Sequence, residues 1–253
     1  MVAEIFIGTS GWHYNDWTRT FYPPEITGYH ELTYHARFFN TVENNSSFYR
    51  VASEPTYKTW SKMTRGGYKF SIKLNKQITH TNKLRISDDV REKVDYILDT
   101  TQVLENKIGA LLIQLPASFK FDLERLKLFL AFFTKKVRSH PFAFDLAIEF
   151  RNRYWFTEET YALLRKYNVA LVAADSSRYP SVREVTANVA YIRMHGPTKL
   201  FASSYSDEQL KDLAEYIQTI SPGVNRIYVY FNNDFHGYAI KNAQRLQYFL
   251  GPG

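Results

Sequence analysis

The sequence predicts a single (β/α)8 barrel, an α/β fold of the TIM type. Eight short apolar runs follow one another along the chain, nearly all ending in a polar or charged residue, and segments with helical periodicity lie between them. Such alternation is typical of parallel strands joined by helices. The 253 residues of the chain also suit one barrel, which needs about 250 residues. We therefore expect residues 1–253 to form one domain.

The predicted strands are the eight apolar runs, at residues 5–10, 41–45, 69–73, 110–114, 147–151, 170–175, 190–195 and 226–234. The predicted helices cover residues 28–39, 54–63, 87–104, 123–137, 157–167, 206–220 and 237–250. Ser87 and Ser206 each precede two acidic residues, which is the pattern of a helix N-cap and first turn. The crossover at residues 176–188 is shorter and is predicted to hold only a turn or two of helix.

Composition excludes several kinds of site. The chain has no cysteine, so disulfides, thiolate nucleophiles and cysteine-ligated metals are excluded. The first predicted strand begins near the N-terminus and leaves no room for a signal peptide, and no apolar run reaches membrane-spanning length. We therefore expect a cytoplasmic protein without a membrane partner. The formal net charge of +7 at pH 7 favours anionic partners, although lysines and arginines are scattered along the chain.

Alternation along the strands indicates which side chains face the barrel interior. In the seventh strand Ile192 and Met194 share one face, whereas Tyr191, Arg193 and His195 share the other. Large aliphatic residues are expected against the helices, so the polar set should point inward. The same alternation turns inward a set of polar residues near other strand ends, namely Glu43, Asn45, Ser71, Lys73, Gln114, Glu149 and Arg151. Active sites in this fold lie at the C-terminal ends of the strands, so a polar rim is predicted there.

The candidate catalytic residues on this rim are Glu43, Lys73, Glu149 and His195. Glu43 or Glu149 is the expected base, and His195 is the expected general acid or base. The candidate substrate-binding residues, on strand ends or in the loops after them, are Ser10, Trp12, Tyr14, Asn45, His80, Gln114, Arg151, Trp155, Asp175, Arg193, Asn232 and Asn233.

A structural salt-bridge network is the alternative explanation for these charges, for example with Glu43 on Arg193 and Lys73 on Glu149. The two explanations differ in what a substitution should do. If Glu149 acts in catalysis, replacing it by Gln should abolish turnover and spare the melting temperature. A large loss of stability would instead indicate the network.

Three cations on the rim favour an anionic substrate. Lys73, Arg151 and Arg193 belong to three different strand ends and are suited to hold developing negative charge. Barrels often bind phosphate between the loops after strands seven and eight, and Asn232 opens the second of these loops. We therefore predict an enzyme of the hydrolase or lyase class. Its expected substrate is an anionic, phosphate-bearing small molecule or nucleic-acid fragment, cleaved by hydrolysis or acid–base chemistry.

Several alternative functions stay open. We predict no cofactor, but a divalent metal is an alternative, since His13, His80, His195 and His236 fall in or beside the rim loops. Such a site would make a metal-dependent phosphodiesterase, although the rim cations would repel a dication. A non-catalytic nucleic-acid-binding protein is a further alternative, because aromatic residues and arginines mix in the loops after the first and fifth strands. No oligomeric state is predicted.

The rim residues are compatible with two further reactions. Glu43 and Glu149 would form the carboxylate pair of a glycosidase. The nearby arginines would lower a carboxyl pKa, whereas a general acid needs a raised one. Lys73 could also attack a carbonyl as a Schiff-base lysine, but acidic neighbours would keep it charged.

The rim residues also fall in an ordered series of motifs. These are Gly8-Thr9-Ser10-Gly11-Trp12, Phe21-Tyr22-Pro23, Thr41-Val42-Glu43, Ser47-Phe48-Tyr49, Thr79-His80, Gln114-Leu115-Pro116, Glu149-Phe150-Arg151, Asp175-Ser176, His195-Gly196 and Asn232-Asn233. The series resembles the YecE-like family, grouped as domain of unknown function 72, over essentially the whole chain. The resemblance implies a TIM-type barrel of unassigned function. Asn44 departs from it, because the family more often has an aliphatic residue there.

Overall fold

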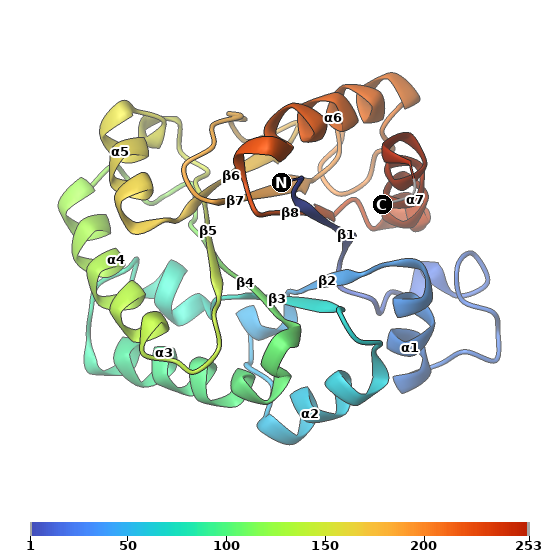
Figure 1. Ribbon diagram of the computed structural model, residues 1–253, viewed down its shortest axis with the longest axis horizontal. Helices are drawn as coiled ribbons and strands as arrows, with labels where there is room; N and C mark the ends of the chain where they lie inside the picture. The colour runs from blue at the N-terminus through green and yellow to red at the C-terminus, as the bar shows by residue number, and fades with distance from the viewer. Residues whose placement is uncertain (1, 252–253) are drawn as a thin grey trace.

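The strands form a closed barrel, as the sequence predicts. The computed structural model describes residues 2–251, in which eight parallel strands pair in chain order and β1 closes onto β8. Figure 1 shows these strands as a central ring with the helices outside it. The strands are β1 (Glu4–Ser10), β2 (Thr41–Asn44), β3 (Lys69–Lys73), β4 (Ile108–Gln114), β5 (Asp145–Glu149), β6 (Ala170–Asp175), β7 (Val189–Met194) and β8 (Arg226–Phe231).

The helices of the described residues cover the outside of the barrel. They are α1 (Tyr29–Phe38), α2 (Glu54–Met63), α3 (Asp88–Thr101), α4 (Leu123–Arg138), α5 (Glu158–Tyr167), α6 (Asp207–Ile220) and α7 (Tyr238–Leu250). Both predicted N-caps are confirmed. The Ser87 hydroxyl accepts the amide of Val90 at 3.3 Å, and Ser206 forms a capping box with Gln209.

Short helical turns of the 3-10 or π type lie mostly in the loops after the strands. They are Asn15–Trp17, Ser46–Phe48, Gln77–Thr81, Gln102–Lys107, Arg153–Trp155, Ser221–Gly223 and Phe235–Gly237. The turn at Gln102–Lys107 continues directly from α3. The single long helix predicted over residues 87–104 is therefore an α-helix followed by a tighter turn.

The sixth crossover differs from its prediction, because residues 176–188 contain no helical turn. Two features of the sequence explain this difference. Tyr179 precedes Pro180, and a residue before proline is disfavoured in the helical conformation. Further on, the Thr186 hydroxyl accepts the amide of Leu171 at 2.8 Å and donates to the carbonyl of Val169 at 2.7 Å. These bonds hold the segment in an extended course beside β6.

Three predicted strands were too long at their C-terminal ends. The runs at residues 147–151, 190–195 and 226–234 continue past the observed ends at Glu149, Met194 and Phe231. Asn45 likewise lies just after β2. The polar residues beyond these ends belong to the loops that form the mouth of the barrel. The apolar periodicity of the sequence does not show at which residue each strand ends.

Inside the barrel, three tyrosines fill much of the space between the strands. Near the N-terminal ends of the strands Tyr228 donates to Asp145 at 2.8 Å. Two residues further along β8, Tyr230 donates to the hydroxyl of Ser71 at 2.8 Å. Tyr191 of β7 lies opposite Tyr228 in register, and its hydroxyl donates to Glu43 at 2.6 Å. The interior is therefore packed with large side chains up to the level of Glu43, as expected of this fold.

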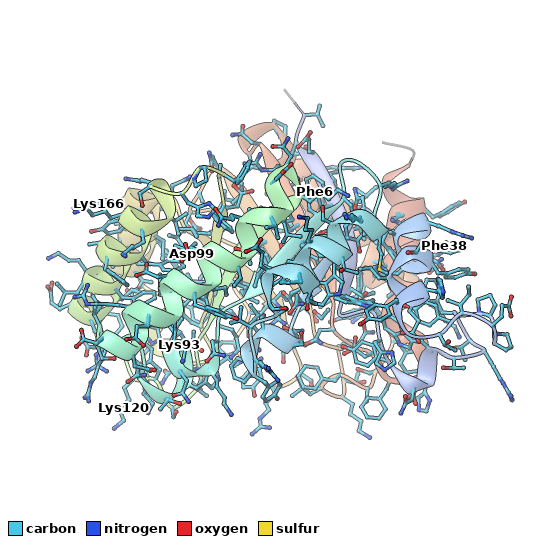
Figure 2. All side chains as sticks on the ribbon, turned by 90° about the horizontal axis from the view of Figure 1, so that it is seen from below. Phe6, Phe38, Lys93, Asp99, Lys120 and Lys166 are labelled. Carbon is cyan, nitrogen blue, oxygen red and sulfur yellow. The ribbon has the colours of Figure 1, made fainter. Side chains whose placement is uncertain are left out.

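Outside the barrel, the strands and helices bury two large apolar clusters, one beside α1–α5 and one beside α6–α7. Figure 2 shows Lys93 and Asp99 of α3 and Lys166 of α5 on the outer side of the helical layer. No helix within residues 2–251 is both long and apolar enough to cross a lipid bilayer.

Candidate active site at the C-terminal mouth

A buried arginine joins two carboxylates at the top of the barrel interior. Arg193 extends from β7, and its guanidinium donates to Glu43 of β2 at 2.6 Å and to Glu149 of β5 at 2.5 Å. Arg193 and Glu149 are each only 1% exposed and Glu43 is fully buried. The predicted Glu43–Arg193 pair is therefore present, and the same arginine also neutralises Glu149.

Glu43 has all the hydrogen bonds that a carboxylate needs. Besides Arg193, it accepts the hydroxyls of Ser10 at 2.7 Å and Tyr191 at 2.6 Å. Burial alone would raise the pKa of Glu43, but the charge of Arg193 and these hydrogen bonds outweigh it and lower the pKa. A carboxylate stabilised in this way is a weak base, so the geometry does not favour Glu43 as a proton acceptor.

Glu149 is held by a second arginine. Arg151 lies just after β5 and donates its Nε to Glu149 at 2.8 Å. The two arginines outweigh the effect of burial and keep the pKa of Glu149 well below its usual value. A glycosidase needs one of its two carboxyls protonated. Since the pKa of both Glu43 and Glu149 is lowered, this pair lacks a general acid.

Lys73 differs from the other cations at the mouth. It ends β3, and within residues 2–251 its amine forms neither a salt bridge nor a hydrogen bond, although it lies 4.3 Å from the ring centre of Phe48. The predicted Lys73–Glu149 pair is absent. Burial and the nearby positive charge of Arg193 lower the pKa of Lys73 to about 7. The amine is therefore able to gain or lose a proton near neutral pH.

Two histidines at the mouth are neutral. Burial, together with the positive charges of Lys73 and Arg151, lowers the pKa of His80 to about 4. Burial and Arg193 likewise lower the pKa of His195. The Nε2 of His195 lies 3.5 Å from an Arg193 nitrogen and 3.6 Å from a carboxylate oxygen of Glu149. Its Nδ1 lies 3.0 Å from the Oδ1 of Asn232, an oxygen that can only accept, so Nδ1 donates to it.

Asp234 was not among the predicted site residues. Asn232 donates to its Oδ2 at 3.0 Å, whereas its Oδ1 is buried without a hydrogen-bond partner among the residues described. Burial raises the pKa of Asp234 to about 8. The only signal in the sequence is that Asp234 closes the predicted eighth strand. An aspartate followed three positions later by glycine resembles an ordinary turn, and nothing local in the sequence reveals its burial.

Several other predicted residues also surround the mouth. Ser10 and Gln114 are buried at the ends of β1 and β4. Asn45 is half-buried, and its Oδ1 is without a partner among the described residues. Tyr14 donates its hydroxyl to the Ser10 carbonyl. Sequence reasoning missed Tyr179, whose ring lies 4.3 Å below the Arg151 guanidinium.

Trp155, Asp175 and Asn233 have their contacts away from the ion-pair network, so the structure does not bring these three predicted residues together with the others. Trp155 is 1% exposed and is stacked on Phe150 in the core. Asp175 follows Ala174, which faces the interior, so it turns outward and accepts the hydroxyl of Tyr205 at 2.8 Å. Asn233 is fully buried and hydrogen-bonds to residues between β7 and α7.

Trp12 lies apart from this network. It packs edge-on against Trp60 of α2, with 4.9 Å between ring centres, and lines a hollow of about 260 Å³ between α1 and α2. The predicted metal-ligating residues are dispersed as well. Within residues 2–251 no three histidine, aspartate or glutamate side chains are grouped so that they could hold a metal ion.

Comparisons with known proteins agree with the fold. A family model described as "Protein of unknown function DUF72" matches residues 6–252. The UPF0759 protein YunF of Bacillus subtilis (strain 168) is 24% identical over 96% of this chain and 93% of its own length. The UPF0759 protein YecE of Escherichia coli (strain K12) is 31% identical, over 46% of this chain and 39% of its own length.

A solved structure is also similar over nearly its whole length. This DUF72 family protein from Thermotoga maritima MSB8 has a TM-score of 0.84 and 28% identity, and the likeness covers 98% of this chain and 99% of that one. The similarity therefore includes all eight strands and the loops that form the mouth.

Proposed function

The chain belongs to the family described as Protein of unknown function DUF72, and we propose that it is an enzyme that cleaves an anionic, phosphate-bearing substrate at the C-terminal mouth of the barrel. The observation that carries this proposal is the amine of Lys73. It lies beside a buried ion-pair network, has no carboxylate partner within residues 2–251, and has a pKa lowered to about 7. A group poised near the working pH is suited to proton transfer.

The charges at the mouth favour an anion next to Lys73. Arg193 and Arg151 already match the two carboxylates Glu43 and Glu149. Among the described residues the Lys73 amine has no carboxylate partner, so it can hydrogen-bond to a phosphate that Arg151 holds beside it. Arg151 is half-buried. Its Nε donates to Glu149 at 2.8 Å and its Nη1 to the Tyr179 hydroxyl at 3.5 Å, so among the described residues its Nη2 is left for a phosphate oxygen.

Hydrolysis at this site needs one group that moves protons. The neutral amine of Lys73 takes a proton from water as the water oxygen bonds to phosphorus. The bond from phosphorus to the leaving oxygen breaks, and that oxygen departs with the bonding pair. The Lys73 ammonium then gives its proton to the leaving oxygen, which restores the neutral amine. Arg151 stabilises the charge on the phosphoryl oxygens.

In this mechanism the other candidates act indirectly. Glu43 and Glu149 fix the guanidinium of Arg193, and that positive charge in turn helps to lower the pKa of Lys73. Neutral His195 fixes the side chain of Asn232. We therefore assign these residues positioning roles and assign proton transfer to Lys73.

Binding of inorganic phosphate tests the anion site directly. We expect calorimetry to show phosphate binding that weakens at least tenfold in Lys73→Met and in Arg151→Met. Lys76→Met is the matched control, because Lys76 is an exposed lysine three residues further along the same loop. Absence of phosphate binding, or equal loss in all three variants, would overturn the anion site.

Catalysis is tested with p-nitrophenyl phosphate and bis(p-nitrophenyl) phosphate. We expect kcat/KM to rise with pH through about 7, because the reactive form of Lys73 is neutral. This activity should be lost in Lys73→Met and persist in EDTA. Activity that survives in Lys73→Met, or that EDTA abolishes, would overturn the lysine mechanism.

A further inference from the structure

A hollow of about 420 Å³ opens beside the buried network, on the side of the mouth formed by the loops after β1, β7 and β8. Its walls include the aromatic rings of Tyr14, Phe201 and Phe235, and its polar surface includes Asn232 and Asp234. None of the lysines and arginines in residues 2–251 lines it. An anionic group would therefore find no counter-charge here, unlike at Lys73 and Arg151.

The ring of Phe201 is held at the wall of the hollow by its backbone. Phe201 has φ of 62°, a conformation that non-glycine residues rarely adopt. Its amide donates to the carbonyl of His195 at 2.6 Å, and its own carbonyl accepts the amide of Phe235 at 3.4 Å. These bonds connect the loops after β7 and β8. They also place the Phe201 ring edge-on to His195, with 5.7 Å between ring centres.

Asp234 provides a hydrogen-bonding group that its neighbours do not satisfy. Its Oδ2 accepts from Asn232, and its Oδ1 is buried without a partner among the residues described. Burial raises its pKa to about 8, which favours the protonated carboxyl at neutral pH. Asp234 can then donate a hydrogen bond to a ligand atom.

We propose that this hollow binds the uncharged ring of the substrate, a planar heterocycle of the nucleobase type, and that Asp234 donates a hydrogen bond to an acceptor on that ring. The inference rests on the proposed function, which places the phosphate at Lys73 and Arg151. Aromatic walls stack on planar rings. The chain Asp234–Asn232–His195–Arg193 links the hollow to the ion-pair network, so one nucleotide-like molecule would contact both parts of the mouth.

Calorimetry with adenosine 5′-monophosphate, ribose 5-phosphate and adenosine tests the inference. We expect the nucleotide to bind at least tenfold more tightly than ribose 5-phosphate, and Phe235→Ala to abolish that difference. Phe235 is 53% exposed, so this change should leave the fold intact. Tyr154→Ala is the control, because Tyr154 is an exposed aromatic residue in the loop after β5. Equal affinity of the two phosphates in the wild type would overturn the inference.

The role of Asp234 has its own test, with adenosine as the ligand so that no phosphate titrates. Affinity should fall at least threefold as pH rises from 7 to 9, and Asp234→Asn, which keeps a donor, should remove this pH dependence. The groups facing Asp234 are Tyr14, Glu43 and Arg193, and Asp16 lines the same hollow. Glu43 and Arg193 are ion-paired and the pKa of Tyr14 is raised, so these three keep their charge in this range, and Asp16→Asn, which should retain the pH dependence, is the control for Asp16. A pH dependence that Asp234→Asn retains would refute the assignment.

The two proposals fail in different ways. If the phosphate site is wrong but the hollow is a ring site, adenosine binds in a manner that depends on Phe235, and phosphate affinity is unaffected by Arg151→Met. If the ring site is wrong but the phosphate site is correct, ribose 5-phosphate and the nucleotide bind equally, and both depend on Arg151.

Discussion

At the scale of single residues, Arg193 organises the mouth of the barrel. Its guanidinium is buried between Glu43 and Glu149, and its Nε has no hydrogen-bond partner among the residues described. Burying a charge is tolerated only when it is paired. Arg193 therefore requires both carboxylates, and each carboxylate requires Arg193. Lys73 is close to this network and not part of it, and for that reason its amine is free for chemistry.

This pairing predicts the outcome for Glu149→Gln. The substitution leaves Arg193 and Arg151 short of a buried counter-charge, so we expect the free energy of unfolding to fall by roughly 3–5 kcal/mol. Urea denaturation measures it. Glu158→Gln is the control, because the Glu158 side chain is 84% exposed and 3.6 Å from Arg165, and it should leave stability nearly unchanged.

The same experiment separates the structural and catalytic roles of the carboxylates. If Glu149→Gln is as stable as the wild type and inactive, Glu149 is catalytic and our positioning role for it is wrong. Lys73→Met should show the reverse behaviour, a loss of activity with little loss of stability, because Lys73 has no ion pair within residues 2–251 to break.

At the scale of elements, the loop after β7 determines the shape of the hollow. The chain turns at Gly196, where φ is 106°, and returns so that the Phe201 amide bonds to His195. A Cβ on Gly196 would lie 2.6 Å from the carbonyl oxygen of Lys199 and 2.9 Å from the Ser203 hydroxyl. Only glycine fits both this backbone conformation and this close approach.

We therefore expect Gly196→Ala to destabilise the fold by roughly 2 kcal/mol and to weaken adenosine binding, because the loop that holds Phe201 must shift. Gly223→Ala is the matched control. A Cβ on Gly223 would have no atom within 4 Å, and the φ of Gly223 is not positive. Thermal unfolding of Gly223→Ala should therefore show little change. Wild-type stability in Gly196→Ala would contradict this explanation of the loop.

At the scale of the whole molecule, the two ends of the barrel interior carry different chemistry. The N-terminal end is closed by Asp145, which accepts two bonds from Arg226 at 2.7 and 2.9 Å and one from Tyr228. The C-terminal end holds Lys73 and Asp234, whose protonation states change near neutral pH. These two groups therefore lie at the end where loops surround the mouth.

Buried histidines predict how the whole fold responds to acid. Burial lowers the pKa of His35 to about 3, and the pKa values of His80 and His195 are lowered as well. In the unfolded chain these groups take up protons below pH 6.5 that the folded chain does not bind, so stability falls as pH falls. Asp234 acts in the opposite direction, because it binds a proton only in the folded state over this range, but the histidines outnumber it.

We expect the free energy of unfolding to fall by roughly 3 kcal/mol between pH 6.5 and 4.5, as measured by urea denaturation. Below this range Glu43 and Glu149, whose folded pKa values are lowered, add to the loss. In His35→Gln the free energy of unfolding should fall less steeply with pH, because unfolding then takes up about one proton fewer. Stability that rises on acidification would mean that these histidines are not neutral in the folded state.

Much of the fold was predictable from the sequence. Alternation in β7 placed Tyr191, Arg193 and His195 inside and Ile192 and Met194 outside, because a strand has a period of two residues wherever it lies. The strand order followed from the β/α repeat, since parallel neighbours need crossover connections. The least accurate predictions concerned the C-terminal ends of the strands and the crossover at residues 176–188. The crossover has no helix because Thr186 bonds to the backbone of residues 169 and 171, and no local pattern in the sequence shows these bonds.

The sequence by itself thus determined the barrel and most of the polar residues at its mouth, because both follow from local periodicity. Only the tertiary structure decided that Arg193 takes both carboxylates, that Lys73 is left without a partner among the described residues, and that burial raises the pKa of Asp234. The physical reason is that ion pairing and pKa depend on distance and on the exclusion of water. Both are set by residues far apart in the chain, and no local pattern records them.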